Sequence, residues 1–474
     1  MRLGQTSFFH YASNLIASLL GFAATIYFTQ LLGPEVFGTY SLIIVVVAWL
    51  EFGGELGMTA ALKKRLSERG DSAPFLVAGA VSMSIFFAAT ALIVIAVAPQ
   101  LTSYIGIDAT ALILVLLGAK VLQSFVRTVL EGQHKVHFAG ALEPLQRFGQ
   151  SAVQIGLLAA GFGLTGMLIG AVAGIVFSAI LGGMKIHLSY VPPAREHFKS
   201  LLSFAQFSWL DSLRGRSFTW MDIFVLGFFV PSALVGIYNA AWNVASFLAF
   251  GNAVASSFFP EMSEMSSKGD FDQIGGLISD TLAFTGLFLI PGLVGTLLLG
   301  DRILLFYGPE FPTGHSALIL LVAALLVNGY FKQLLTALTA VNRPELAFRS
   351  NAAFISANIG LNVLLVWQLG WLGAAVGSLI ASAFALGVTY RYIDDIVSFS
   401  IPYHELLRQV GAAAVMGGVI WTILLSVEST TLPLPSYVVT VLLVGLGAIT
   451  FFISLVTFSP RFRRVVRDNV APLR

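Results

Sequence analysis

Long apolar stretches alternate with short polar segments along almost the whole chain. A helix needs about 20 apolar residues to cross the hydrocarbon core of a bilayer, and fourteen stretches approach or exceed that length. Their approximate bounds are Ser13–Leu32, Phe37–Leu62, Pro74–Ala98, Ala109–Leu130, Leu145–Gly161, Thr165–Met184, Phe204–Phe229, Ser232–Phe259, Ile274–Leu299, Ala317–Ala340, Ser350–Leu369, Gly373–Tyr390, Leu406–Val427 and Tyr437–Phe458. The pattern predicts an all-α polytopic membrane protein with about 14 transmembrane helices and no folded domain outside the membrane.

Composition agrees with this pattern and excludes several kinds of chemistry. Hydrophobic residues make up 57% of the chain and charged residues 11%, whereas a soluble domain carries about 25% charged residues. There is no cysteine, so disulfides and thiolate metal sites are excluded. Neither a P-loop nor an H-E-x-x-H motif occurs. We therefore expect no direct use of ATP, no metal and no cofactor.

Positive charge falls on one set of the segments between the spans. Of the 26 Lys and Arg residues, only Arg302 lies on the opposite set, and Lys120, Arg214, Arg216 and Lys332 lie inside spans. Loops on the cytoplasmic side of membrane proteins are enriched in Lys and Arg. Both termini are therefore predicted to be cytoplasmic, in a multi-pass protein of the cell membrane. The basic segment Arg461–Arg467 then serves either as a topology anchor or as a site for anionic lipid.

Two short patterns recur about 200 residues, or six spans, apart. Phe37-Gly38-Thr39-Tyr40 follows the first span, and Val235-Gly236-Ile237-Tyr238 follows the seventh. Gly163, Gly166 and Gly170 have the same spacing as Gly370, Gly373 and Gly377. An even number of spans preserves orientation, so the repeats are parallel and imply a cavity between two similar lobes.

These repeats divide the chain into four parts. We expect an N-terminal lobe at residues 1–190, a cytoplasmic linker at 191–203 and a C-terminal lobe at 204–395. Residues 396–474 hold two additional spans and the basic segment. Rocking of the lobes about the cavity would give alternating access.

Three segments carry a family resemblance that extends over the whole chain. They are Leu31-Leu32-Gly33-Pro34-Glu35-Val36-Phe37-Gly38-Thr39-Tyr40, Asp222-Ile223-Phe224-Val225-Leu226-Gly227, and Leu304-Leu305-Phe306-Tyr307-Gly308-Pro309-Glu310-Phe311. In order and spacing they resemble the oligosaccharide-lipid flippases of Wzx type, a branch of the multidrug/oligosaccharidyl-lipid/polysaccharide (MOP) exporter superfamily. The resemblance implies a flippase that moves a lipid-(pyro)phosphate-linked oligosaccharide from the inner to the outer leaflet.

The expected partners follow from that resemblance: a lipid-linked oligosaccharide, membrane lipids and other proteins of glycan assembly, with no nucleic acid and a monomer as the working unit. Alternatives in the same superfamily are a flippase for a lipid-linked peptidoglycan precursor and a cation-coupled multidrug exporter. A membrane glycosyltransferase or polymerase is disfavoured, because such enzymes commonly place catalytic residues on a large external loop and the outer segments here are short. The chain is thus expected to be a transporter and not an enzyme.

Charges inside spans are the candidate functional residues, since each costs about 2.5–3.5 kcal/mol at a helix centre. The seventh span carries Asp211, Arg214, Arg216 and Asp222. Arginine offers planar, permanently charged donors for phosphate, and Arg214 and Arg216 point about 200° apart on a helix. The alternative is internal neutralisation, with Asp211 paired to Arg214 and Asp222 paired to Arg216. Lys120 and Lys332, in spans four and ten, could complete a basic lining of the substrate cavity.

Acidic and neutral polar residues complete the set. Glu51 and Glu55 lie one turn apart and could couple transport to H⁺ or Na⁺, as could Asp211 and Asp222. Glu51 and Glu55 could instead balance the charge of Lys120 or Lys332. Four further side chains suit sugar hydroxyls and ring faces, although hydrogen bonds between helices would explain them equally well. They are Asn14, Asn239, Trp242 and Asn243.

Overall fold

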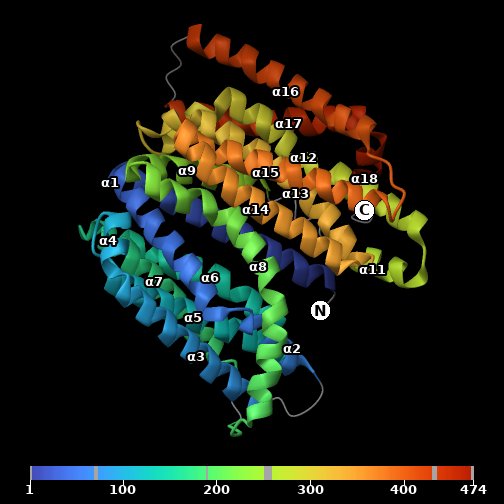
Figure 1. Cartoon of the computed structure of the whole chain (residues 1–474). Coiled ribbons are helices and arrows are strands. Elements are labelled where there is room, and N and C mark those ends of the chain that lie inside the picture. Colours follow the sequence, from blue (N-terminus) through green and yellow to red (C-terminus); the bar gives the residue numbers. More distant parts are fainter. Residues whose placement is uncertain (1–2, 69–72, 188–189, 250–258, 430–434, 471–474) are drawn as a thin grey trace. The chain divides into compact units, whose positions relative to one another are not determined.

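A computed structural model describes residues 3–68, 73–187, 190–249, 259–429 and 435–470. These residues fold almost entirely into helices, with no strand among them, which confirms the all-α prediction. By its packing the chain divides into two compact units, Met1–Gly236 and Ile237–Arg474. Figure 1 shows the helices coloured along the sequence.

In the part of the first unit that the structure describes there are eight helices and the start of a ninth. They are α1 (Leu3–Glu55), α2 (Met58–Ser67), α3 (Ala73–Ala96), α4 (Ala98–Ile105), α5 (Thr110–Gly132), α6 (Val136–Ala159), α7 (Gly163–Gly183), α8 (Arg195–Phe229) and the first turn of α9 (Ser232–Leu248). Two large apolar clusters hold most of them together: one joins α1, α3, α4, α5 and α7, and the other joins α2, α3, α5 and α8. A smaller cluster joins α5 and α6.

The first two expected spans form one helical run, α1, with a break in its middle. Gly33 there has φ 74° and ψ 176°, and Pro34 follows it. Proline cannot donate to the preceding turn, and glycine readily adopts positive φ. The prediction that the second span reaches Leu62 was wrong: the helix ends at Glu55, where Leu56 (φ 40°) and Gly57 (φ 76°) turn the chain into the short helix α2.

Small residues bring α6 and α7 into close contact. A Cβ on Gly174 would lie 2.6 Å from the carbonyl oxygen of Gln146 in α6, so only glycine permits this approach.

The predicted linker 191–203 is helical from Arg195 onward, where it forms the start of α8. The chain before it, Pro192-Pro193, is too stiff to continue a helix. The lobe boundaries expected from the repeats stay a prediction.

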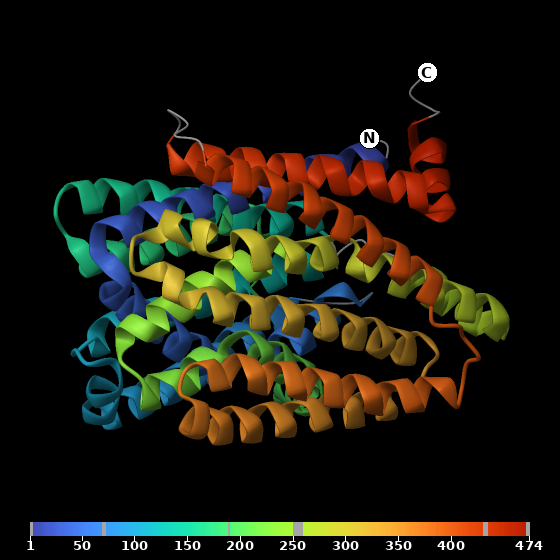
Figure 2. The same ribbon diagram turned by 90° about the horizontal axis from the view of Figure 1, so that it is seen from above.

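The second unit continues from α9. It contains α11 (Phe259–Lys268), α12 (Phe271–Leu304), the short 3₁₀ turns η2 (Leu305–Tyr307) and η3 (Phe311–Gly314), α13 (His315–Ala340), α14 (Pro344–Leu369), α15 (Leu372–Asp394), α16 (Tyr403–Ser429), α17 (Ser436–Phe458) and α18 (Pro460–Val470). Helix α15 packs against α13 and α14, while α16 and α17 pack together against α12. Figure 2 shows the α14–α15 and α16–α17 pairs from a second direction.

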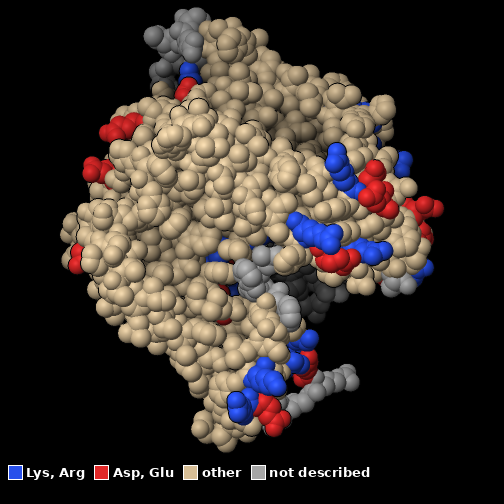
Figure 3. All heavy atoms as spheres, in the orientation of Figure 1, with Lys and Arg blue, Asp and Glu red and all other residues tan. Residues whose placement is uncertain are grey.

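The surfaces of both units suit a lipid environment. Ten stretches of the described chain are long and apolar enough to cross a membrane, which agrees with the expected fourteen spans without establishing that number. On the face shown in Figure 3, uncharged side chains form most of the surface and charged ones gather in groups. Helix α3, for example, exposes Ile85, Leu92, Ile93 and Ile95. The polar helices α6 and α8 are not among the ten, and both contribute to the site described next.

Candidate functional site

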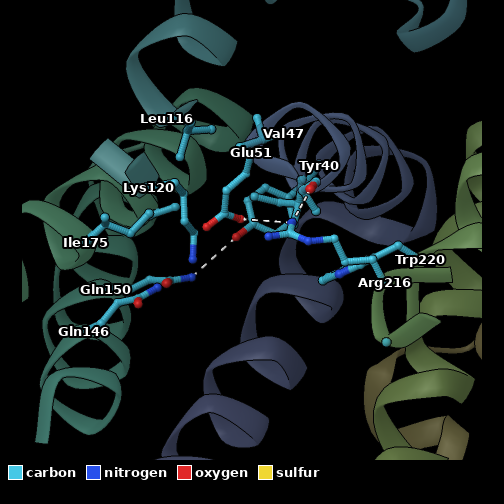
Figure 4. Close-up of a pocket in the computed structure, with 14 residues that line it drawn as sticks. Tyr40, Val47, Glu51, Leu116, Lys120, Gln146, Gln150, Ile175, Arg216 and Trp220 are labelled. Carbon is cyan, nitrogen blue, oxygen red and sulfur yellow. Dashed lines mark hydrogen bonds and ion pairs between the residues drawn. The ribbon is translucent and has the colours of Figure 1, made fainter. Parts of the chain in front are cut away.

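A cavity of about 550 Å³ lies among five helices of the first unit. Its lining side chains come from α1, α5, α6, α7 and α8, and Figure 4 shows the polar ones pointing into the same space. The lining consists of Tyr40, Ile44, Val47, Ala48, Glu51, Leu116, Lys120, Gln146, Gln150, Ala171, Ile175, Gly215, Arg216 and Trp220.

One face of α1 forms the largest part of the wall. Tyr40, Ile44, Val47, Ala48 and Glu51 recur every three or four residues, which places them on the same side of a helix. Ile43 and Val46 of the same segment are buried in the apolar cluster of the unit, which also includes Val47 of the cavity wall. The helix therefore brings a phenol and a carboxylate into the cavity while its apolar side chains pack in the core of the unit.

Arg216 of α8 is the central charged group. Its Nη1 donates to the backbone carbonyl of Ala48 and lies 3.4 Å from Oε2 of Glu51, while Nη2 lies 3.5 Å from Oε2 of Glu55. The guanidinium also lies 5.8 Å from the ring centre of Phe52, within the range of a cation–π contact. The two carboxylate distances exceed the usual 2.7–3.2 Å of an N–H···O bond, so Arg216 bridges both acids loosely.

Arg216 and its two acidic partners are largely shielded from solvent. The side chains of Arg216, Glu51 and Glu55 are 19%, 18% and 13% exposed. Oε1 of Glu55 is buried without a hydrogen-bond partner, which is costly for a charged oxygen. Lys120 acts on Glu55 through its positive charge. The cavity thus holds two cations against two carboxylates and is close to electrically balanced.

The wall facing Arg216 carries amide side chains of α6 beside Lys120 of α5. Gln150 of α6 donates to the hydroxyl of Tyr40 (3.4 Å), and Gln146 accepts a hydrogen bond from Gln123 of α5 (2.8 Å). Gln154, one turn further along α6, donates to the backbone carbonyl of Met167 at 2.8 Å. Amide side chains of this kind can both donate and accept. The cavity therefore offers a guanidinium and a carboxylate on one side, and an ammonium with two-way hydrogen-bonding amides on the other.

The structure brings some of the predicted site residues together. Arg216, Lys120 and Glu51 line the cavity, and Glu55 contacts it through Arg216. The alternative that Arg216 pairs with Asp222 was wrong, because Glu51 and Glu55 are its acidic partners.

Other predicted residues lie elsewhere. Arg214 and Asp222 are on α8 but do not line this cavity, as expected for Arg214 from its different helical face. The side chains of Asn14 and Asp211 lie outside the part of the chain that the structure describes. Four predicted residues belong to the second unit and are not part of this site: Lys332, Asn239, Trp242 and Asn243.

The apolar lining residues were missed from the sequence, as were four polar or aromatic ones: Tyr40, Gln146, Gln150 and Trp220. A signal for two of them was present. Gln146, Gln150 and Gln154 recur every four residues, which predicts a polar stripe on one face of an otherwise apolar helix. Tyr40 was noted only as part of a repeat, and nothing in the local sequence marks Trp220 as a cavity residue.

The arrangement suits recognition of a polar, anionic headgroup. Guanidinium and ammonium groups can bind phosphate oxygens, and glutamine amides and an indole ring suit sugar hydroxyls and ring faces. Within the described residues no group of three His, Asp or Glu side chains comes together as metal ligands. The groups of the cavity can bind anions and form hydrogen bonds with neutral polar groups.

Comparisons with known proteins show the family to which the chain belongs. The model of the family described as "Polysaccharide biosynthesis protein" matches residues 28–312. The chain is 29% identical over 474 residues to the "Probable flippase AglR" of Haloferax volcanii, covering 98% of both chains. It is 27% identical over 424 residues to the "Probable low-salt glycan biosynthesis flippase Agl15" of the same organism, covering 89% of this chain and 90% of the relative.

Solved structures share the fold at low sequence identity. "Lipid II flippase MurJ, inward closed conformation" has a TM-score of 0.79 at 16% identity and covers 97% of this chain and 100% of its own. An inward-facing "multidrug resistance MATE family transporter of the MOP superfamily" has a TM-score of 0.65 at 16% identity, covering 80% of this chain and 95% of its own. At such identity the likeness concerns the fold.

Proposed function

Because this chain belongs to the polysaccharide biosynthesis protein family and is a transporter of the MOP superfamily, we propose that it moves a lipid-(pyro)phosphate-linked oligosaccharide from the cytoplasmic to the outer leaflet of the cell membrane. The observation that carries the proposal is the cavity of the first unit, where Arg216 faces Lys120 and the glutamines of α6. The names of the two Haloferax volcanii relatives, both probable flippases, support the same class of substrate.

In this proposal the phosphate of the substrate competes with carboxylates for Arg216. The guanidinium has two acidic partners at 3.4 and 3.5 Å, and phosphate can form shorter, bidentate bonds with the same fork of donors. Lys120 supplies a second positive charge on the opposite wall. Substrate entry would release Glu51 and Glu55 from Arg216 while adding negative charge to the cavity.

Proton uptake follows from that competition. A carboxylate released in a poorly solvated cavity is stabilised by binding a proton, so Glu51 or Glu55 would take up H⁺ as the phosphate binds Arg216. The other titratable groups facing this space are Tyr40 of α1 and Lys120 of α5, since α6 and α7 contribute only uncharged residues to the lining. Alternating access would then release proton and lipid-linked glycan on the outer side, with both termini cytoplasmic.

Two alternative functions occur in the superfamily: a cation-coupled multidrug exporter and a flippase for a lipid-linked peptidoglycan precursor. The ion pairs of Arg216 count against a site for cationic drugs, because both nearby carboxylates already have a positive partner. The peptidoglycan-precursor alternative has a substrate of the same chemistry, and its test is the identity of the glycan that accumulates.

The first experiment measures on which leaflet the lipid-linked glycan lies in cells depleted of this protein. An external glycan-cleaving probe reports the outer pool, and we expect the glycan to become inaccessible and to return when the wild-type chain is restored. Unchanged sidedness after depletion would refute the flippase proposal and favour drug export.

Variants then test the cavity separately from the function. R216Q at normal protein level should leave most glycan inaccessible, whereas R147Q should restore sidedness fully. Arg147 is a matched control, because it lies in the same unit, pairs with Glu143 at 2.7 Å and does not line the cavity. Normal flipping by R216Q would refute the role of Arg216 and leave the flippase proposal standing.

A further inference from the structure

The helix α18 is fixed to the end of α17 by a defined junction. Ser459 adopts an extended conformation after Phe458, and its hydroxyl accepts a hydrogen bond from the backbone N–H of Phe462 at 2.9 Å. This is the geometry of a serine that caps a helix N-terminus. The same hydroxyl donates to the carboxylate of Glu405 in α16. Serine thus ties three helices of the second unit together and sets the direction of α18.

The apolar side of α18 packs inward. The ring of Phe462 stacks on Phe452 of α17, with ring centres 6.1 Å apart and planes 22° from parallel. Phe462 also packs against the apolar cluster formed by α12, α16 and α17. Burial of this ring holds the first turn of α18 against the unit.

Two of the four arginines of α18 complete that attachment. Arg461 forms an ion pair with Asp280 of α12. Arg463 donates to the backbone carbonyls of Val456 (3.1 Å) and Thr457 (2.8 Å), which belong to the last turn of α17 and have no partner within the helix. These side chains hold α18 in place from its polar side.

The other two arginines, Arg464 and Arg467, are exposed. They lie three residues apart on the helix, so they share one face with Arg463. Helix α17 is the most apolar candidate span of the chain, with a mean hydropathy of 2.5, and α18 begins two residues after it ends. A short helix in that place lies at the level of lipid headgroups.

From this placement we propose that α18 is a docking surface for anionic phospholipids, whose headgroup phosphates bind Arg464 and Arg467. Charge complementarity supports this partner. Each arginine on a basic face next to a spanning helix raises the affinity for anionic lipid by about fivefold. A topology signal needs only the number of positive charges on one side. Helix α18 has more than these charges, because Ser459, Phe462 and the bonds of Arg461 and Arg463 hold it in one orientation against the unit. The proposal does not depend on which substrate the transporter carries.

The absence of cysteine from the chain allows a site-specific test. The full-length protein carries one introduced cysteine with a fluorophore: L407C near the start of α16, or V441C near the start of α17. Leu407 and Val441 are 68% and 60% exposed. Leu407 is two residues from Glu405, the partner of the α18 cap, whereas Val441 lies at the other end of α17. Quenching by nitroxide-headgroup phosphatidylglycerol is compared with quenching by the matching phosphatidylcholine in vesicles.

We expect phosphatidylglycerol to be preferred at L407C by about tenfold or more, as two arginines imply, and not at V441C. R464Q/R467Q should remove the preference, whereas R464K/R467K should keep most of it and 1 M NaCl should weaken it. K268Q is the matched control, because Lys268 is an exposed cation of α11 that pairs with Glu264. A preference that survives R464Q/R467Q, that is equal at both labels, or that inorganic phosphate abolishes at millimolar concentration would overturn the proposal.

Discussion

Replacement of Arg216 by glutamine should destabilise the first unit, because it leaves two enclosed carboxylates without their shared partner. Removing one member of a buried ion pair costs about 3–5 kcal/mol. We expect the lower end of that range, about 3 kcal/mol, because the bridging distances of 3.4 and 3.5 Å are long and Lys120 remains in the cavity. For a unit of this size each kcal/mol lowers Tm by about 2–4 °C, so R216Q should unfold about 6–12 °C below the wild type.

The assay is thermal unfolding of the purified protein in one detergent, followed by intrinsic fluorescence and by the loss of the monodisperse peak on size exclusion. The double variant R216Q/E55Q removes one charge of each sign and leaves Glu51 to balance Lys120, so it should recover most of the lost stability. R147Q, which breaks an exposed ion pair, should stay within about 2 °C of the wild type. An unchanged Tm in R216Q, or a double variant R216Q/E55Q less stable than R216Q, would refute the charge-bridge reasoning.

Three further predictions concern packing and hydrogen bonds, each read as a change in Tm. G174A should lower the free energy of unfolding by about 1–3 kcal/mol, because its Cβ would meet the backbone of α6 at 2.6 Å. G183A, at the end of the same helix with open space around it, should leave Tm unchanged. Equal losses of Tm in the two variants would contradict this prediction. Y104F should cost about 1 kcal/mol, since the Tyr104 hydroxyl donates to a backbone carbonyl of α8 at 2.8 Å; no loss would mean that water replaces the bond. S459A should cost about 1–2 kcal/mol through the lost cap and the lost bond to Glu405, and S459D should not restore it, because a second carboxylate would face Glu405.

The membrane architecture was predictable because the bilayer imposes a length. Each spanning helix must satisfy its own backbone in lipid, so runs of about 20 apolar residues report helices directly. Helix ends were less predictable. The chain around Leu56 and Gly57 is apolar enough to read as a continuing span, and only the left-handed backbone of these two residues ends α1 there.

The site was predictable in its residue types but not in its pairings. Intramembrane charge marked Arg216, Lys120 and Glu51, since each is costly without a partner or a polar cavity. Which charges meet depends on the rotation of each helix about its axis, and Arg216 lies 165 positions from Glu51 in the sequence. The sequence offered Asp222, on the same helix, only as an alternative partner of Arg216, whereas the acidic partners in the structure are on α1.

A permanently charged group with two loosely bound acidic partners, such as Arg216, can readily exchange these carboxylates for the phosphate of a substrate. If Arg216 were unpaired, an enclosed guanidinium would bind phosphate so strongly that release would limit transport, and the empty cavity would carry an uncompensated charge. If it formed short bonds to a single carboxylate, phosphate would have to displace a strong pair. The bridge to Glu51 and Glu55 lies between these extremes, because each contact is longer than an ordinary hydrogen bond while the total charge stays balanced. In the proposed mechanism the same two carboxylates would compensate the added charge of a bound phosphate by taking up a proton, so weak binding and ion coupling would have one structural origin.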